Sequence, residues 1–363
     1  MRVLLTGGAG FVGLNLAQRL LSSGATVVCF GPVAPVAAAS ACFACLPGRW
    51  VIEPGDVRDA GRIAELIGRH GVTHVVHGAA ITAGLEREAR QAADIAEVNL
   101  VGTLNVLQAA RRASLARVIV LGSGAVFGAA GIGPSRLRED EIVPRPESLY
   151  GITKQAAESA AVRFRQSHGL DVAVARLGVV FGPWEHDTGV RDTLSLPFLL
   201  NRMAQAGETA RLGRGTPDDW IHAGEAAEAV TRLLEAASLR HALYHVGSGR
   251  RWSLAAWCEQ LRRHYPAFTT RSGSIRPASI SAAARLPRAR RSTSRACAIK
   301  PASSPRMTRP RPAPAIRHGG RACAPVSATP PLSSERRDAA RCRPRIQAAC
   351  RPLTRCYRRL TKQ

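Results

Sequence analysis

Residues 1–31 read MRVLLTGGAGFVGLNLAQRLLSSGATVVCFG, and the order of their apolar and glycine positions decides the fold. The run RVLL from Arg2 predicts a short strand, and the TGGAGFVG that follows predicts a glycine-rich turn. LNLAQRLLSSG places its leucines at helical spacing, and ATVVCF from Ala25 predicts a second strand. Strand, turn, helix and strand in this order predict a βαβ unit, which belongs to a parallel sheet.

The predicted turn carries Gly7, Gly10 and Gly13 at three-residue spacing. Positions without a side chain let a pyrophosphate approach the start of the helix, where backbone N–H groups lack partners. Phe11 and Val12 open that helix, so we expect them at the same site. A plain strand-to-helix turn is the alternative, but the order of the flanking elements favours a dinucleotide site.

The end of the second strand departs from the usual form of this motif. An acidic residue normally stands there, about 20 residues beyond the glycines, and binds the adenosine ribose. Here Gly31, Pro32 and Val33 stand in its place, and no Arg or Lys lies nearby to meet a 2′-phosphate. The residues leave the choice between NAD and NADP open, with NAD favoured. Cys42 and Cys45 form a CxxC in the next loop, but without further ligands they predict no metal site.

A tyrosine and a lysine stand one helical turn apart near the middle of the chain. Only three of the 51 Lys and Arg residues are lysines, and only Lys154 precedes residue 275. Tyr150 comes four residues earlier in SLYGITKQAAE, so a helix would place both side chains on one face. A tyrosine, whose pKa is near 10, acts as a general acid/base at neutral pH when a cation stabilises its phenolate. The spacing predicts a catalytic pair, and a solvated surface pair is the alternative.

Ser123 follows the predicted buried strand RVIVL at Arg117–Leu121. Ligands bind at the carboxyl edge of open parallel sheets, so a hydroxyl there could bond the same substrate oxygen as the tyrosine. A serine that only forms a turn is the alternative.

The formal charge of +25 is distributed unevenly. Residues 276–363 hold 22 Lys and Arg against 2 Asp and Glu, whereas residues 1–275 have a net charge of +5. The tail is rich in Arg, Pro, Ala and Ser, a composition that cannot form a core and predicts disorder. A GC-rich gene read in the wrong frame gives such a string, so we expect a frameshift near residues 268–275. A genuine basic arm that binds nucleic acid is the alternative.

Nine scattered cysteines with no secretory signal predict a reducing, cytoplasmic setting. The sequence contains no apolar run of about 18 residues, so we expect no membrane span.

With these residues in place, the chain resembles the extended short-chain dehydrogenases/reductases. More narrowly, it is similar to the NAD-dependent epimerase/dehydratase family typified by UDP-glucose 4-epimerase. The resemblance covers most of residues 1–260, and its motifs stand in the family's order: TGGAGFVG, GDVRD around Asp56, HGAA from His77, VNLVGT around Asn99, then Ser123, Tyr150 and Lys154.

The resemblance implies a role for each matching position. It makes Tyr150 the acid/base, Lys154 its partner and the anchor of the nicotinamide ribose, and Ser123 the polariser of the reacting oxygen. Hydride would pass between nicotinamide and a carbinol carbon. The implied contacts with the pyrophosphate are Gly7, Gly10, Phe11, Val12 and Gly13, and those with the adenine are Asp56 and Val57. The implied contacts with the rest of the cofactor are Ala79, Ala80, Asn99, Tyr150 and Lys154.

Three departures from the family narrow the reaction. Gly124 and Ala125 follow Ser123 where the family's dehydratases have an Asp-Glu pair, which disfavours a dehydratase. Val179 and Asp218 replace an Asn and an Arg that help hold a substrate diphosphate, which weakens the nucleotide-sugar interpretation. These departures point to a smaller sugar, a sugar acid or another secondary alcohol as the substrate. The polar candidates to bind it are Arg176, His186, Arg191 and His222, and a purely structural role is the alternative for each of them.

We therefore predict a doubly wound, Rossmann-like α/β domain at residues 1–182, to which residues 219–248 return. Residues 183–275 form an incomplete substrate lobe, and 276–363 a disordered tail. The expected activity is NAD(P)-dependent oxidation or reduction of a sugar-like secondary alcohol, by a homodimer without metal. A 4-epimerase with retained NAD, or a non-catalytic dinucleotide- or polyanion-binding protein, is the alternative. Nucleic acid is a partner only if the tail is genuine.

Overall fold

The computed structural model describes residues 1–131, 136–186, 188–189, 191–192, 194–213 and 218–272. The tail at 276–363, with its predicted disorder, lies outside this part. No helix within these ranges has the length and the apolar character to cross a membrane. The same residues contain no group of His, Cys, Asp and Glu side chains that could hold a metal ion.

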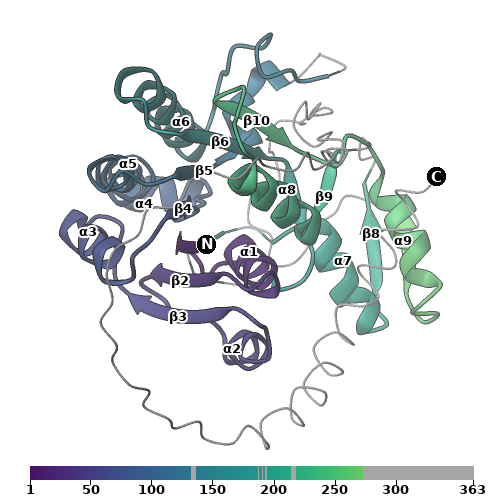
Figure 1. Ribbon diagram of the computed structural model, residues 1–363. Coiled ribbons are helices and arrows are strands. Elements are labelled where there is room, and N and C mark those ends of the chain that lie inside the picture. Colours follow the sequence, from purple (N-terminus) through teal and green to yellow (C-terminus); the bar gives the residue numbers. More distant parts are fainter. Residues whose placement is uncertain (132–135, 187, 190, 193, 214–217, 273–363) are drawn as a thin grey trace, which may run out of the picture.

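A parallel sheet of seven strands forms the centre of the described chain (Figure 1). β1 pairs with β2 on one side and with β4 on the other, so the strand order reverses at β1. In such a sheet the crevice beyond the carboxyl ends of the strands, at the reversal, is the usual ligand position. Across the sheet the strands are β10 (Leu243–Val246), β6 (Val172–Leu177), β5 (Arg117–Ser123), β4 (His74–His77), β1 (Arg2–Thr6), β2 (Thr26–Gly31) and β3 (Arg49–Pro54).

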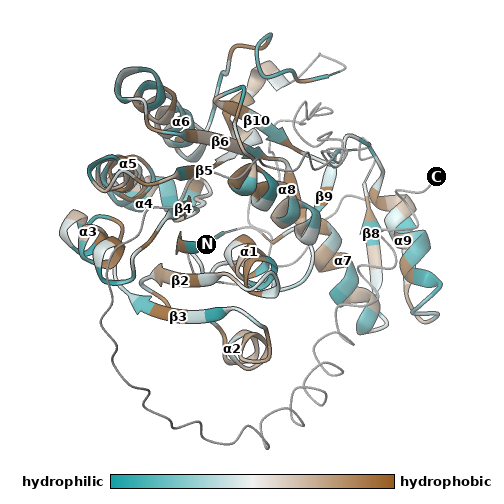
Figure 2. Cartoon of the chain, viewed as in Figure 1, coloured by the Kyte–Doolittle hydropathy of each residue, from teal (hydrophilic) through white to brown (hydrophobic). Residues whose placement is uncertain are grey.

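Helices cover both faces of the sheet. Along β1, Val3 and Leu5 belong to one apolar core and Leu4 to the other, as period-two alternation requires. The first core is closed by α1 (Phe11–Ser22), α2 (Ala37–Phe43) and α8 (Ala223–Glu235), and the second by α3 (Ala60–Arg69), α5 (Gly102–Arg112) and α6 (Leu149–His168). Figure 2 shows these helices with both hydrophobic and hydrophilic residues. The doubly wound fold predicted from the sequence is confirmed.

Short segments connect these layers at the carboxyl edge of the sheet. α4 (Leu85–Ala96) continues into a π-helical turn, η1 (Glu97–Val101), which leads into α5. The 3₁₀ turns η2 (Gly124–Phe127) and η3 (Ala129–Gly131) follow β5.

A smaller lobe packs around its own aromatic core. Phe181, Trp220, Trp252, Trp257 and Phe268 are buried together there. Trp257 also donates from Nε1 to the carbonyl of Pro197 at 3.1 Å, which joins the helix that carries Trp257 to the helix that carries Pro197. The lobe consists of β7 (Val179–Phe181), α7 (Leu196–Gln205), β8 (Thr209–Leu212), β9 (Trp220–His222), α9 (Leu254–Arg262) and β11 (Thr269–Ser272).

Candidate active site

The turn between β1 and α1 depends on its glycines. Gly7 has φ +69°, a conformation that favours glycine. A Cβ on Gly13 would lie 2.3 Å from the Gly7 carbonyl oxygen, so α1 starts directly against the turn. Gly10 N–H closes the turn by donating to the same carbonyl at 3.0 Å.

The start of α1 fits the pyrophosphate of a dinucleotide. Gly10 is the N-cap residue, no side chain caps the helix, and its first turn contains no acidic residue. A Cβ on Gly10 would meet only the Gly7 oxygen, at 3.3 Å, so the space in front of the helix is open. The Arg191 guanidinium lies 5.1 Å from the centre of the Phe11 ring and pairs with Glu185 at 3.2 Å. Open N–H groups with a cation alongside suit an anion.

The segment after β3 holds Asp56 and Val57 beside the end of β2. Asp56 accepts a hydrogen bond from the backbone N–H of Arg58 at 2.8 Å, and its carboxylate pairs with the Arg58 guanidinium at 2.9 Å. The bonds from Arg58 hold the pKa of Asp56 below its usual value. Val57 is buried, with Gly102 of α5 directly against it.

A buried chain of hydrogen bonds runs from β1 to α6. The His77 ring lies between two threonines. Thr6 Oγ1 is 2.7 Å from its Nδ1, and Thr103 Oγ1 is 2.9 Å from its Nε2. Thr103 Oγ1 donates to the carbonyl of Asn99, and Asn99 Nδ2 donates to Thr153 Oγ1 at 3.0 Å. Sequence reasoning assigned Asn99 to the cofactor and missed the threonines, because no motif marks them and their partners lie far away along the chain.

The same network also holds the backbone of the segment after β4. Thr6 Oγ1 accepts from the backbone N–H groups of Gly78 and Ala79 at 3.2 Å each. Asn99 Oδ1 accepts from the N–H of Ile81 at 2.8 Å. The segment after β4, which contains Ala79 and Ala80, is therefore held from both sides.

Tyr150 and Lys154 lie on the first turns of α6. Ser148 caps this helix, since its Oγ accepts from the N–H of Gly151 at 3.0 Å. Tyr150 is half-buried, and Lys154 is only 4 % exposed. Burial lowers the pKa of Lys154 to about 8, while the Glu158 carboxylate acts in the opposite direction. Within the described part of the chain, no hydrogen bond engages the Tyr150 hydroxyl or the Lys154 ammonium, so both are available to ligands.

Burial also lowers the pKa of His77, to about 3, and the Lys154 charge adds to this shift. His77 is therefore neutral at physiological pH, so its ring donates from one nitrogen and accepts at the other.

Ser123 ends β5 and faces the same crevice edge. Its Oγ accepts from the N–H of Ala125 at 3.2 Å, which leaves the hydroxyl hydrogen to donate elsewhere. A Cβ on Gly151 would lie 2.8 Å from the carbonyl oxygen of Ala125. The start of α6, which carries Tyr150, thus packs directly on the loop that begins at Ser123.

Arg176, a candidate substrate contact, is held inside the protein by a buried ion pair. Its guanidinium is 4 % exposed and pairs with Glu158, donating from Nε to Oε2 at 2.6 Å. Its Nη1 lies 3.2 Å from His245 Nε2, and its charge lies over the ring of Phe127. These contacts fix α6 on β6 and on η2. Sequence reasoning missed Glu158, although it stands one further helical turn after Lys154.

His222, another candidate substrate contact, is also buried and bonded within the protein. It is 7 % exposed, and its Nδ1 accepts from the N–H of Gly224 at 3.2 Å, so it caps α8. Its ring packs edge-on against Phe181. His186 Nδ1 lies 2.7 Å from the Trp184 carbonyl oxygen. Of the four polar candidates, Arg191 lies beside the turn between β1 and α1, where its guanidinium faces the Phe11 ring.

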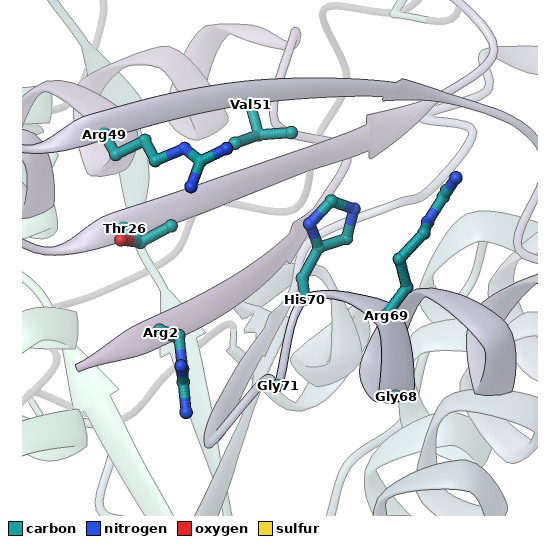
Figure 3. A pocket seen from close by; sticks show the side chains of 8 residues that line it. All are labelled: Arg2, Thr26, Arg49, Val51, Gly68, Arg69, His70 and Gly71. Atoms are coloured by element: carbon teal, nitrogen blue, oxygen red, sulfur yellow. The ribbon is translucent and has the colours of Figure 1, made fainter.

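A cavity of about 690 Å³ lies at the opposite edge of the sheet (Figure 3). Its walls come from the first residues of β1, β2 and β3 and from the end of α3. Glu53 balances part of the positive charge around the cavity, because it pairs with Arg69 at 3.0 Å. It also contacts His70 at 2.7 Å. The cavity is separate from the crevice described above, and its lining residues are Arg2, Thr26, Arg49, Val51, Gly68, Arg69, His70 and Gly71.

Comparison with known proteins agrees with the fold and the motifs. A dTDP-glucose 4,6-dehydratase of Actinoplanes sp. is 28 % identical over 263 residues, which cover 69 % of this chain and 77 % of the relative. A dTDP-6-deoxy-L-talose 4-dehydrogenase (NAD(P)(+)) of Kitasatospora kifunensis is 32 % identical over 212 residues, 58 % of this chain and 62 % of the relative.

Solved structures show the same fold. The UDP-glucose 4-epimerase of Thermus thermophilus, in complex with NAD, has 27 % identity and a TM-score of 0.61, covering 76 % of this chain and 88 % of that one. MoeE5 in complex with UDP-glucuronic acid and NAD has 25 % identity and a TM-score of 0.64, covering 81 % and 90 %. The model of the NAD dependent epimerase/dehydratase family matches residues 3–247, and the chain therefore belongs to that family.

Proposed function

We propose that the protein is an NAD-dependent oxidoreductase acting on a secondary alcohol or carbonyl of a sugar-like substrate. The observation that carries this proposal is the placement of Lys154. A buried ammonium, with no hydrogen-bond partner in the described chain, lies one turn along α6 from a half-buried tyrosine. Burying an ionised lysine costs stability, which a purely structural position would avoid with an apolar residue.

Each residue of this centre has a role in moving one proton. Tyr150 accepts the proton of the substrate hydroxyl, and the Lys154 charge stabilises the phenolate before that transfer. Ser123 donates a hydrogen bond to the same substrate oxygen and so holds it in reach of Tyr150. Bound NAD supplies the hydride acceptor for the carbinol carbon.

The cofactor would be held by the elements that frame the crevice. The N–H groups of Phe11 and Val12 meet the pyrophosphate, and Gly10 leaves room for it. Asp56 and Val57 meet the adenine, and the backbone at Ala79 and Ala80 lines the path between. Arg191, which pairs with Glu185, would offer its remaining N–H donors beside the phosphates.

The substrate lobe favours a compound without a diphosphate. Asp218 stands where the family places an arginine, and burial raises its pKa to about 6, so no cation comes from this position. Val179 offers no donor where the family has an asparagine. η2, directly after Ser123, contains no acidic residue, so a general acid for elimination is missing at that place.

The substitution Tyr150→Phe tests this proposal. We expect turnover to fall by at least 100-fold, because general acid/base catalysis contributes about 10²–10⁴-fold. The affinity for NAD, measured by calorimetry, should change little. A variant that turns over sugar alcohols as fast as the parent would show that Tyr150 is not the acid/base.

A 4-epimerase with retained NAD is the second candidate, favoured by the similarity to the Thermus enzyme. An epimerase would return the hydride to the other face of the same carbon. Tightly held NAD after purification, and substrate conversion without accumulation of NADH, would favour the epimerase. Dissociable NAD with net NADH formation would favour the dehydrogenase.

A further inference from the structure

The carboxyl end of β2 leads into a segment without charge. Residues 31–48 contain no Asp, Glu, Lys, Arg or His. The adenosine ribose is expected at this end of the strand, so the segment itself offers a 2′-phosphate neither a cationic side chain nor a carboxylate. Any discrimination between NAD and NADP must come from a neighbouring element.

The neighbouring element is the segment that leaves β3. Gly31 pairs with Pro54 in register, and the N–H of Gly55 donates to the Gly31 carbonyl at 3.1 Å. Gly55 has φ +155°, and a Cβ there would lie 2.4 Å from the ring of Phe30. The backbone after β3 therefore passes tightly against the end of β2, and Asp56 is the next residue.

Arg58 is the cation nearest along the chain to this point, and three carboxylates hold it. It pairs with Asp56 at 2.9 Å, with Asp94 of α4 at 3.3 Å and with Glu97 of η1 at 3.1 Å. We call these four residues the Arg58 cluster. Their formal net charge is −2, and their side chains are between 34 % and 52 % exposed. Asp56, which follows Gly55 at the end of β2, thus connects this end of the sheet to a group of side chains with surplus negative charge.

We propose that the Arg58 cluster makes this protein select NAD over NADP. The inference rests on the dinucleotide site of the proposed function. A 2′-phosphate would be repelled by the two surplus carboxylates, and Arg58 cannot turn to it without leaving three existing partners. The 2′-hydroxyl of NAD has no charge and meets no such penalty. Carboxylates from the segment after β3, from α4 and from η1 thereby replace the acidic residue that β2 lacks.

The double variant Asp94→Asn/Glu97→Gln tests the inference on the full-length chain. It removes both surplus charges and leaves Arg58 with one charged partner. We expect the Kd for NADP, measured by calorimetry, to fall about tenfold, because each exposed charge contributes up to about 1 kcal/mol. The Kd for NAD should stay within about twofold. Both side chains are half exposed, so the variant should fold like the parent.

The control Glu86→Gln/Glu259→Gln removes the same formal charge from two helix surfaces away from the end of β2. It should leave the ratio of the two dissociation constants unchanged. Adding Arg58→Met to the first double variant should abolish the gain in NADP affinity, since Arg58 would be the group that binds the phosphate.

The outcomes separate this inference from the proposed function. A parent that binds NAD, with a double variant whose NADP affinity does not rise, overturns the role of the Arg58 cluster and leaves the NAD site intact. An equal gain in the control variant also overturns it, because net charge would then be the cause. A parent that binds neither dinucleotide contradicts both proposals.

Discussion

Lys154 is subject to two opposing effects. In the proposed mechanism its charge stabilises the Tyr150 phenolate, whereas its burial disfavours that charge and lowers the pKa of Lys154 from 10.5 to about 8. Glu158, one turn further along α6, acts against this shift. At neutral pH the ammonium therefore persists, but at a cost to the stability of the fold.

The substitution Lys154→Met should raise the free energy of unfolding at pH 7. Below pH 8 the lysine is protonated in both the folded and the unfolded chain, so the free energy of unfolding is lowered by the whole cost of burying the charge. For a pKa that falls from 10.5 to about 8, this cost is about 3 kcal/mol. Between pH 8 and 10.5 the folded chain loses this proton first, and the cost shrinks. Urea unfolding at pH 7 and pH 10 should therefore show a gain that is smaller at pH 10.

Gln155→Met, the next position on α6, is the matched control and should show no such pH dependence. An equal gain for Lys154→Met at both pH values would mean that better packing, and not the removal of a buried charge, causes it.

The sequence was sufficient for the residues that belong to a local pattern. Tyr150 and Lys154 stand four apart, and Gly7, Gly10 and Gly13 stand three apart, so spacing alone indicates their placement. The buried partners could not be found in this way. Thr6 and His77 are separated by 71 residues and meet only because β1 and β4 are neighbours in the sheet.

At the scale of elements, α6 is the part that assembles the candidate site. Its first turn contacts the loop after β5, and the ion pair between Glu158 and Arg176 joins its middle to β6. Sequence patterning predicted this helix and the strand before Ser123. It did not predict η1, in which Asn99 bonds to Ile81 and Thr153, residues that are far away along the chain. The burial of Arg176 and His222 could not be predicted in this way, because the sequence shows charge but not burial.

Gly151→Ala tests the contact between α6 and the Ser123 loop. The new Cβ would lie 2.8 Å from the Ala125 oxygen, which belongs to the backbone and cannot rotate away. We expect α6 to shift by a few tenths of an ångström and turnover to fall by about tenfold, since catalysis is sensitive to misplacement of this size. NAD affinity should remain close to that of the parent.

Ile152→Ala, at an exposed position of the same helix turn, is the control and should leave turnover unchanged. If Gly151→Ala retains full turnover, the contact does not set the geometry of the site.

At the scale of the whole molecule, the described fold forms the dinucleotide crevice from residues far apart in the sequence. Three parts of the chain meet at one edge of the sheet. Gly7, in the turn after β1, lies against the backbone of Gly78 after β4, and Arg191 is bridged to Thr82 and lies over the ring of Phe11. A ligand that fits this edge contacts all of them at once and only in the folded chain. Binding should therefore stabilise the whole fold, and by an amount that the ligand concentration determines.

We expect NAD to raise the thermal unfolding midpoint of the full-length chain. With free NAD at 100 times its Kd, the stabilisation should be about 2.7 kcal/mol. Gly10→Val is the decisive variant. Gly10 has φ −77°, and a Cβ there meets only the Gly7 carbonyl oxygen, at 3.3 Å, so a valine fits the backbone conformation. Valine is a poorer N-cap than glycine, so we expect the variant to fold with a midpoint somewhat below that of the parent. Its side chain would occupy the space in front of α1, where the pyrophosphate must lie, so the NAD-induced shift should disappear. The same shift in parent and variant would place the bound dinucleotide elsewhere, and the start of α1 would then be an ordinary strand-to-helix turn.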